Sequence, residues 1–158
     1  MLPDHWEDIK RIYAEGIATG RATFSTWTPE WEVWDKTYHR HSRLVAVEEN
    51  GVVLGWVALM PVSVRPVYSG VAELSVYIGE GHRGRGIGKL LMLSLIRSSE
   101  EHGIWTLQAV IMTENESSIS LHMSLGFRLV GYRERVAQLK GKWRDSVLME
   151  RRSKTIGI

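Results

Sequence analysis

His82-Arg-Gly-Arg-Gly-Ile-Gly-Lys89 joins a predicted apolar strand, residues 72–78, to a predicted amphipathic helix. Glycine has no Cβ, so the backbone of such a joint can approach an anion closely. The first N–H groups of the following helix lack partners within the helix, and the helix dipole adds positive character there. With the charges of its basic residues added, this glycine-rich segment is predicted to bind phosphate groups.

Spacing excludes two common phosphate-binding loops. A P-loop would need glycine where Arg83 stands and Ser or Thr where Leu90 stands. A dinucleotide-binding fingerprint would need its third glycine at Lys89, and it would follow the first strand of the chain. Neither loop is therefore present.

The remaining pattern, Arg83-x-x-Gly86-x-Gly88, resembles the pyrophosphate-binding motif of the GNAT acyl-CoA N-acetyltransferases. Four further elements resemble the branch of that family that acetylates phosphinothricin and methionine sulfoximine. They are the strand before the loop, the segment 115–127, Ala22-Thr23-Phe24 and Trp143-x-Asp145. The resemblance covers almost the whole chain and implies an α/β GNAT fold, with helices flanking a central mixed, mostly antiparallel sheet.

Length and composition predict one domain, residues 1–158, of a soluble cytoplasmic protein. Of 158 residues 44% are hydrophobic, the net charge is +2, and basic residues concentrate at 83–89 and 140–154, which favours a small anionic ligand over nucleic acid. No apolar run approaches the roughly 20 residues of a membrane span, and no signal-peptide pattern is present. The absence of cysteine excludes disulfides and a cysteine acyl-enzyme, and the scattered histidines predict no metal site.

Hydrophobic periodicity in the first half predicts two helices followed by three strands. A helix capped by Asp4 runs to about residue 18, and a second helix begins near Pro29, which is predicted to lie in its first turn. Asn50-Gly51 is predicted to supply the positive φ angles of a tight hairpin between strands 44–47 and 52–61. Members of the GNAT family usually open with a short strand, whereas this sequence begins almost at its first helix.

The second half predicts a helix, a strand, a helix and a closing hairpin. The helix after the glycine-rich segment ends before Gly103, and its predicted inward residues are Ile87, Leu90, Leu91 and Leu95. A strand at 105–112 precedes a helix capped by Asn115. Strands 127–139 and 142–149 turn around Gly141.

The resemblance implies that acetyl-CoA is the co-substrate. Backbone groups of Val76, Tyr77 and Ile78 would pair with its pantetheine amides as an added strand would. The Asn115 side chain would contact the same arm in addition to capping its helix. The pyrophosphate would lie against Arg83, Gly84, Arg85, Gly86, Ile87, Gly88 and Lys89.

Glu73 and His122 are the predicted catalytic residues. An amine nucleophile must lose a proton, and a partly desolvated glutamate in strand 72–78 would have its pKa raised toward that use. The alternative is a solvated Glu73 on an exposed sheet face. By resemblance, His122 stands where many GNAT enzymes place a tyrosine that protonates the departing thiolate. It could act as that acid, as an alternative base, or only in packing.

The acceptor substrate is predicted to contact Glu73 and a loop arginine. Arg65, followed by Pro66, resembles the arginine of the family's substrate loop, and its guanidinium would hold an α-carboxylate; a surface arginine is the alternative. Phe24, Thr26 and Trp27 would form part of the pocket wall, although Phe24 also suits a core.

A homodimer is also implied, because family members are commonly dimers and seven tryptophans leave aromatic surface to bury. Lys140, Trp143 and Asp145 resemble a late hairpin motif that would complete the pocket, from the same chain or from a partner subunit.

These features imply acetyl-CoA-dependent N-acetylation of the α-amino group of a small amino-acid-like substrate, such as phosphinothricin, methionine sulfoximine or methionine sulfone. Without a cysteine to carry the acyl group, the amine is expected to attack the thioester directly in a ternary complex. Two alternatives remain. The same fold could acetylate another amine, such as a protein N-terminus, a polyamine or an aminoglycoside, or the chain could be a non-catalytic acyl-CoA-binding module.

Overall fold

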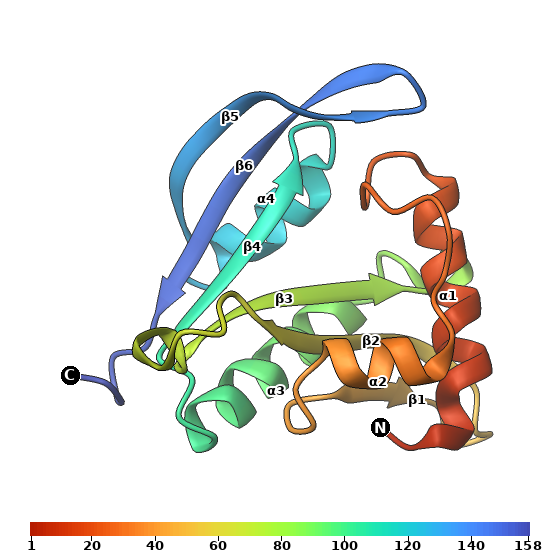
Figure 1. Cartoon of the computed structure of the whole chain (residues 1–158). Helices are drawn as coiled ribbons and strands as arrows, with labels where there is room; N and C mark the ends of the chain where they lie inside the picture. Colours follow the sequence, from red (N-terminus) through yellow and green to blue (C-terminus); the bar gives the residue numbers. More distant parts are fainter.

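A single sheet of six strands forms the centre of the molecule, as the computed structural model of residues 1–158 shows (Figure 1). The strand order is β1-β2-β3-β4-β6-β5. The strands are β1 (Leu44–Val47), β2 (Val53–Pro61), β3 (Val71–Ile78), β4 (Thr106–Met112), β5 (Arg128–Leu139) and β6 (Lys142–Arg152). All neighbouring strands are antiparallel except β3 and β4, which confirms the predicted mixed, mostly antiparallel sheet.

Helices pack on both faces of this sheet (Figure 1). They are α1 (Trp6–Ala18), α2 (Trp31–Thr37), α3 (Ile87–Glu101) and α4 (Glu116–Ser124), with short 3₁₀ turns at Pro3–His5, Pro66–Tyr68 and Glu80–His82. Alternate residues of β3 divide the interior: Leu74 packs in the core beneath α3, whereas Tyr77 packs with the aromatic residues of α1 and α2. None of the helices has the length and apolar character needed to cross a bilayer.

The sheet opens between β3 and β4. These two strands pair only where Val71–Glu73 meets Thr106–Gln108, and beyond that point they diverge (Figure 1). The remainder of β3 pairs with β2 alone. Glu73 therefore lies where the two strands part.

Several boundary predictions hold. Asn115 caps α4, where its Oδ1 accepts a hydrogen bond from Ser118 N–H at 3.4 Å. Gly103 follows the C-cap of α3 with φ +77°. The turn between β5 and β6 has positive φ at Lys140 and Gly141, as a two-residue hairpin requires.

Four predicted details are wrong. Residues 3–5 form a 3₁₀ turn that moves the N-cap of α1 from Asp4 to His5, and Pro29 precedes Glu30, the N-cap of α2. Only Gly51 of the Asn-Gly pair has positive φ, because the β1–β2 turn carries a bulge instead of a two-residue loop. Leu90 is 61% exposed, since the buried stripe of α3 is centred on Leu91, Met92, Leu95 and Ile96.

Candidate active site

The glycine-rich segment leads directly into α3. Gly84 and Gly86 have φ angles of +76° and +79°, in the left-handed region that glycine adopts without strain, and Gly86 is the N-cap of the helix. The first helical hydrogen bond is donated by Leu90 N–H to the Gly86 carbonyl at 3.1 Å. The three preceding N–H groups have no backbone acceptor and can bind an anion.

A cavity of about 400 Å³ lies beside this segment. It is bounded by Val76–Ile78 of β3, the ends of α1 and α4, and the glycine-rich segment. Its charged lining groups are cationic, Arg21, Arg83 and Lys89, and no carboxylate lies among them. This cofactor cavity therefore suits a ligand that carries phosphate groups.

All the predicted cofactor residues except Arg85 line the cofactor cavity. The Arg85 guanidinium instead contacts Glu48 Oε1 and His82 Nδ1, each at 3.0 Å. The Arg83 Nε–H donates to the Ile78 carbonyl at 3.2 Å, which ties the loop to the end of β3.

A second cavity of about 260 Å³ occupies the opening between β3 and β4. It is lined by Glu73, by His122, and by residues of the α1–α2 connection that include Phe24. Ala22, Val76, Tyr77, Asn115 and Ser118 border both cavities. This acceptor cavity is therefore continuous with the cofactor cavity along β3 and the start of α4.

Glu73 supplies the one carboxylate in the lining of the acceptor cavity. It is half-buried, and this burial raises the pKa of its carboxyl group, while the positive charge of Arg133 opposes the rise. Glu73 forms no ion pair, so both of its oxygens can accept hydrogen bonds or a proton from a ligand.

His122 is 1% exposed, and its two ring nitrogens have different surroundings. Nδ1 lies 2.7 Å from the Ser118 carbonyl oxygen, which can only accept, so this geometry assigns the proton to Nδ1. Nε2 is buried without a partner. Burial also lowers the pKa of His122, so the ring is neutral at pH 7 and Nε2 can accept a proton.

Hydroxyl groups also line the acceptor cavity, among mostly hydrophobic residues, and the sequence did not single them out. Tyr38 Oη and Ser75 Oγ lie 3.2 Å apart, and the Tyr13 hydroxyl donates to Ser25 Oγ at 3.0 Å. Burial raises the pKa of Tyr38 to about 12, so it remains a hydrogen-bonding phenol. Side chains alternate along a strand, which places Ser75 on the same face as Glu73, and this alternation could have predicted Ser75 from the sequence.

The other predicted substrate residues lie outside both cavities. Trp27 is 65% exposed, and the Arg65 guanidinium lies over the Tyr68 ring, 5.6 Å from its centre, next to Pro66. Thr26 is exposed as well.

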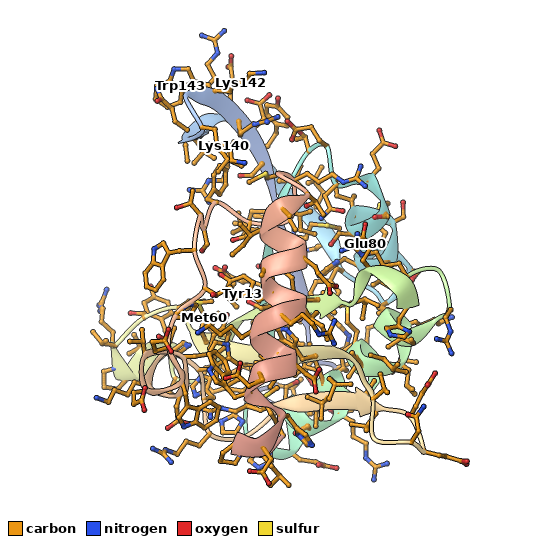
Figure 2. The ribbon with its side chains drawn as sticks, turned by 90° about the vertical axis from the view of Figure 1, so that its right-hand side faces the viewer. Tyr13, Met60, Glu80, Lys140, Lys142 and Trp143 are labelled. Carbon is orange, nitrogen blue, oxygen red and sulfur yellow. The ribbon has the colours of Figure 1, made fainter.

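The β5–β6 hairpin projects beyond the body of the molecule. Figure 2 shows Lys140, Lys142 and Trp143 together at its tip. Asp145 is held within the hairpin, where its carboxylate accepts hydrogen bonds from Arg135 N–H, at 2.7 Å, and from the Tyr132 hydroxyl. Within one chain, these residues do not reach the acceptor cavity.

Comparisons with known proteins identify the family. The model of the Acetyltransferase (GNAT) family matches residues 6–127. An L-methionine sulfoximine/L-methionine sulfone acetyltransferase of Pseudomonas aeruginosa is 35% identical over 90% of this chain and 86% of its own. The phosphinothricin N-acetyltransferase of Streptomyces coelicolor is 34% identical over 96% of this chain and 94% of its own. The chain belongs to the GNAT family and is an N-acetyltransferase.

A solved structure supports the same assignment. It is a GNAT superfamily phosphinothricin acetyltransferase from Sinorhizobium meliloti in complex with AcCoA, 29% identical, with a TM-score of 0.87 over 96% of this chain and 85% of that chain. The cationic cofactor cavity of this protein, with its unpartnered N–H groups, fits the pyrophosphate of such a co-substrate.

Proposed function

We propose that this protein transfers the acetyl group of acetyl-CoA to the α-amine of a small amino-acid-like substrate, such as phosphinothricin, methionine sulfoximine or methionine sulfone. The observation that carries the proposal is the junction of a cationic cofactor cavity with a small cavity that holds Glu73 and His122. The relatives named for these substrates support the same class.

Both substrates would be held at the same time. The N–H groups at the start of α3, with Arg83 and Lys89, would bind the pyrophosphate, and backbone groups of Val76–Ile78 would pair with the pantetheine arm. Acetyl-CoA would supply a thioester that reacts with amines. Direct attack suits a chain without cysteine, because no thiol is present to carry the acyl group.

Glu73 would serve as the general base. As the amine nitrogen bonds to the acetyl carbon, the Glu73 carboxylate removes a proton from nitrogen, the C–S bond breaks and the thiolate leaves. His122 Nε2 provides a second acceptor in the same cavity. With its proton on Nδ1, neutral His122 has none on Nε2 to give to the thiolate, so the role of acid is disfavoured.

The shape and charge of the acceptor cavity support a small substrate. Its volume is about 260 Å³, and it carries one carboxylate together with several hydroxyl groups. Hydroxyl donors suit the oxygens of a sulfone, sulfoximine or phosphinate group. A polyamine or an aminoglycoside would need several carboxylates to balance its charges.

We also propose that two copies of the chain associate. Val64, Val67 and Trp143 are more than half exposed, and such apolar surface is typical of an interface. Association would bring the exposed Arg65 or the hairpin tip of one copy to the acceptor cavity of the other. Light scattering after gel filtration would give twice the chain mass, whereas a monomer at all concentrations would overturn this part of the proposal.

Release of thiol from acetyl-CoA tests the reaction. The panel contains phosphinothricin, methionine sulfoximine, methionine sulfone, a polyamine and a peptide. Turnover restricted to the amino-acid analogues supports the proposal. Turnover only of the polyamine or the peptide overturns the substrate class, and acetyl-CoA binding without turnover of any amine would indicate a binding module.

A further inference from the structure

The junction of the two cavities is where a bound thioester would meet the amine. The pyrophosphate end of the cofactor cavity lies at residues 83–89, and Glu73 lies in the acceptor cavity. The sulfur leaves from the carbon that the amine attacks, so it would lie between these two ends. The charge that the sulfur gains still needs a hydrogen-bond donor, because neutral His122 has its proton on Nδ1, bonded to the Ser118 carbonyl.

Five residues border both cavities, and three of them have polar side chains, namely Tyr77, Asn115 and Ser118. The Tyr77 ring packs against Tyr13 and Trp56, each at 4.9 Å between ring centres. Burial raises the pKa of the Tyr77 phenol well above its usual range, which makes it a poor proton donor. Asn115 caps α4 through Oδ1 and is expected to contact the pantetheine arm. Ser118 is the hydroxyl that remains for the sulfur.

The hydroxyl hydrogen of Ser118 is not used within the chain. The hydroxyl groups of Ser99 and Ser124, in α3 and α4, each donate to a backbone carbonyl one turn earlier at 2.7 Å. Ser118 Oγ instead has a single contact, 3.5 Å from His122 Nδ1. Because Nδ1 carries a proton, Ser118 Oγ can only accept there, and its own hydrogen is free to donate to a ligand.

Ser118 also lies at the positive end of a helix. It is in the first turn of α4, where its N–H donates to Asn115 Oδ1. The dipole of α4 favours a negative charge near this turn. Ser118 is half-buried, so water is partly excluded from its surroundings and a hydrogen bond to an anion is stronger there than in bulk solvent.

We propose that the Ser118 hydroxyl donates a hydrogen bond to the sulfur of acetyl-CoA as the thiolate leaves. The amine nitrogen bonds to the acetyl carbon, Glu73 takes a proton from the nitrogen, the C–S bond breaks and its electron pair moves to sulfur. Ser118 keeps its proton and stabilises the charge on sulfur. This assignment rests on the proposed transfer from acetyl-CoA, but not on which amine accepts the acetyl group.

Binding of CoA and of desulfo-CoA, in which hydrogen replaces the thiol, tests this contact without turnover. A donor to the thiolate lowers the pKa of the bound thiol, so wild type should increasingly prefer CoA over desulfo-CoA as the pH rises from 7 to 10. Ser118→Ala removes the donor and should reduce this preference at the upper end of the range by about tenfold. The affinity for desulfo-CoA should stay within about twofold of wild type. Calorimetric titration measures both affinities.

Steady-state kinetics give a second readout. Ser118→Ala should lower kcat by about 10- to 100-fold with little change in the KM for acetyl-CoA, because the lost hydrogen bond forms with a charge that develops only in the transition state. Ser118→Thr keeps a hydroxyl group and should retain most of kcat.

Ser120→Ala is the matched control. Ser120 lies in the same helix, is exposed and lines neither cavity, so this change should alter neither kcat nor the preference for CoA. Alanine has the highest helix propensity, so both alanine variants should fold.

The outcomes separate this assignment from the proposed function. If wild type acetylates an amine and Ser118→Ala keeps both its kcat and its preference for CoA, the role of Ser118 is overturned and the proposed function stands. Equal losses of affinity for CoA and desulfo-CoA would indicate a structural role and would also overturn it. If wild type binds neither acetyl-CoA nor CoA, or binds them without turnover of any amine, the proposed function fails, and this assignment fails with it.

Discussion

The two cavities are built in opposite ways. The phosphate end of the cofactor cavity consists mainly of backbone from one short segment, residues 83–89, whose shape is set by two left-handed glycines. The acceptor cavity consists of side chains from α1, β2, β3, β4, α4 and a loop. On the proposed function, co-substrate binding would depend on local conformation, whereas acceptor choice would depend on how distant elements pack. Substitutions in the two regions should therefore affect different kinetic parameters.

The largest effect is expected from Glu73→Gln. The change keeps the size of the side chain but removes the proposed base, so kcat should fall by about 10²- to 10⁴-fold with acetyl-CoA affinity unchanged. The loss should be greatest between the pKa of Glu73 and that of the amine, because there the enzyme carries a base and the amine still carries a proton. Steady-state kinetics from pH 5 to 9 and calorimetric titration with acetyl-CoA provide the measurements. Full activity throughout this range would remove Glu73 from the mechanism.

Gly86→Val should affect the other cavity. A β-branched residue at φ +79° is strained, and the resulting shift at the start of α3 should raise the KM for acetyl-CoA by about 10- to 100-fold. The preference among acceptor substrates should stay the same. Gly103→Val is the matched control, because Gly103 has φ +77° at the opposite end of α3. An equal change of KM in both variants would show that the effect is global.

His122→Asn and His122→Gln separate the two ring nitrogens. The asparagine amide can replace the Nδ1 donor to Ser118, and the longer glutamine can place an oxygen near the position of Nε2. If Nε2 accepts a proton or hydrogen bond during turnover, kcat should fall by about tenfold in His122→Asn and by less in His122→Gln. Single-turnover rates provide the measurement. Equal rates in both variants, close to wild type, would leave His122 a packing residue.

The smallest effect is expected from substitutions of Asn115, which borders both cavities. Asn115→Ala should lower the free energy of unfolding by about 1 kcal/mol because the cap of α4 is lost. Asn115→Ser keeps a capping oxygen, so its unfolding in urea should match wild type. If the amide also contacts the acetyl-CoA arm, both variants should show a KM for acetyl-CoA raised by a few fold; a change in neither would make Asn115 a cap alone.

The regions also differ in how far the sequence predicts them. The glycine-rich segment, the Asn115 cap and the alternation of β3 are local patterns, and the structure reproduces each of them. The misplaced start of α1 follows from one competing turn, and the exposure of Leu90 follows from which side of α3 packs against the sheet. Neither is encoded by periodicity alone.

Local sequence patterns predicted only part of the lining of the acceptor cavity. Tyr38, which follows α2, and Ser75 of β3 are 37 residues apart in the sequence and meet only in the folded chain. Arg65, placed by resemblance, lies outside the cavity of its own chain. Long-range pairing was therefore the missing information, because the sequence contains no short-range signal for it.

Because β3 and β4 separate, the ladder of backbone hydrogen bonds between these two strands is incomplete. Amides on the β4 side of residues 74–78 have no neighbouring strand, so their hydrogens are open to exchange with solvent. A co-substrate that supplies the missing acceptors would act as a removable seventh strand, closing the sheet only while the enzyme is loaded. Slower amide exchange along this edge would then report occupancy residue by residue, without any turnover.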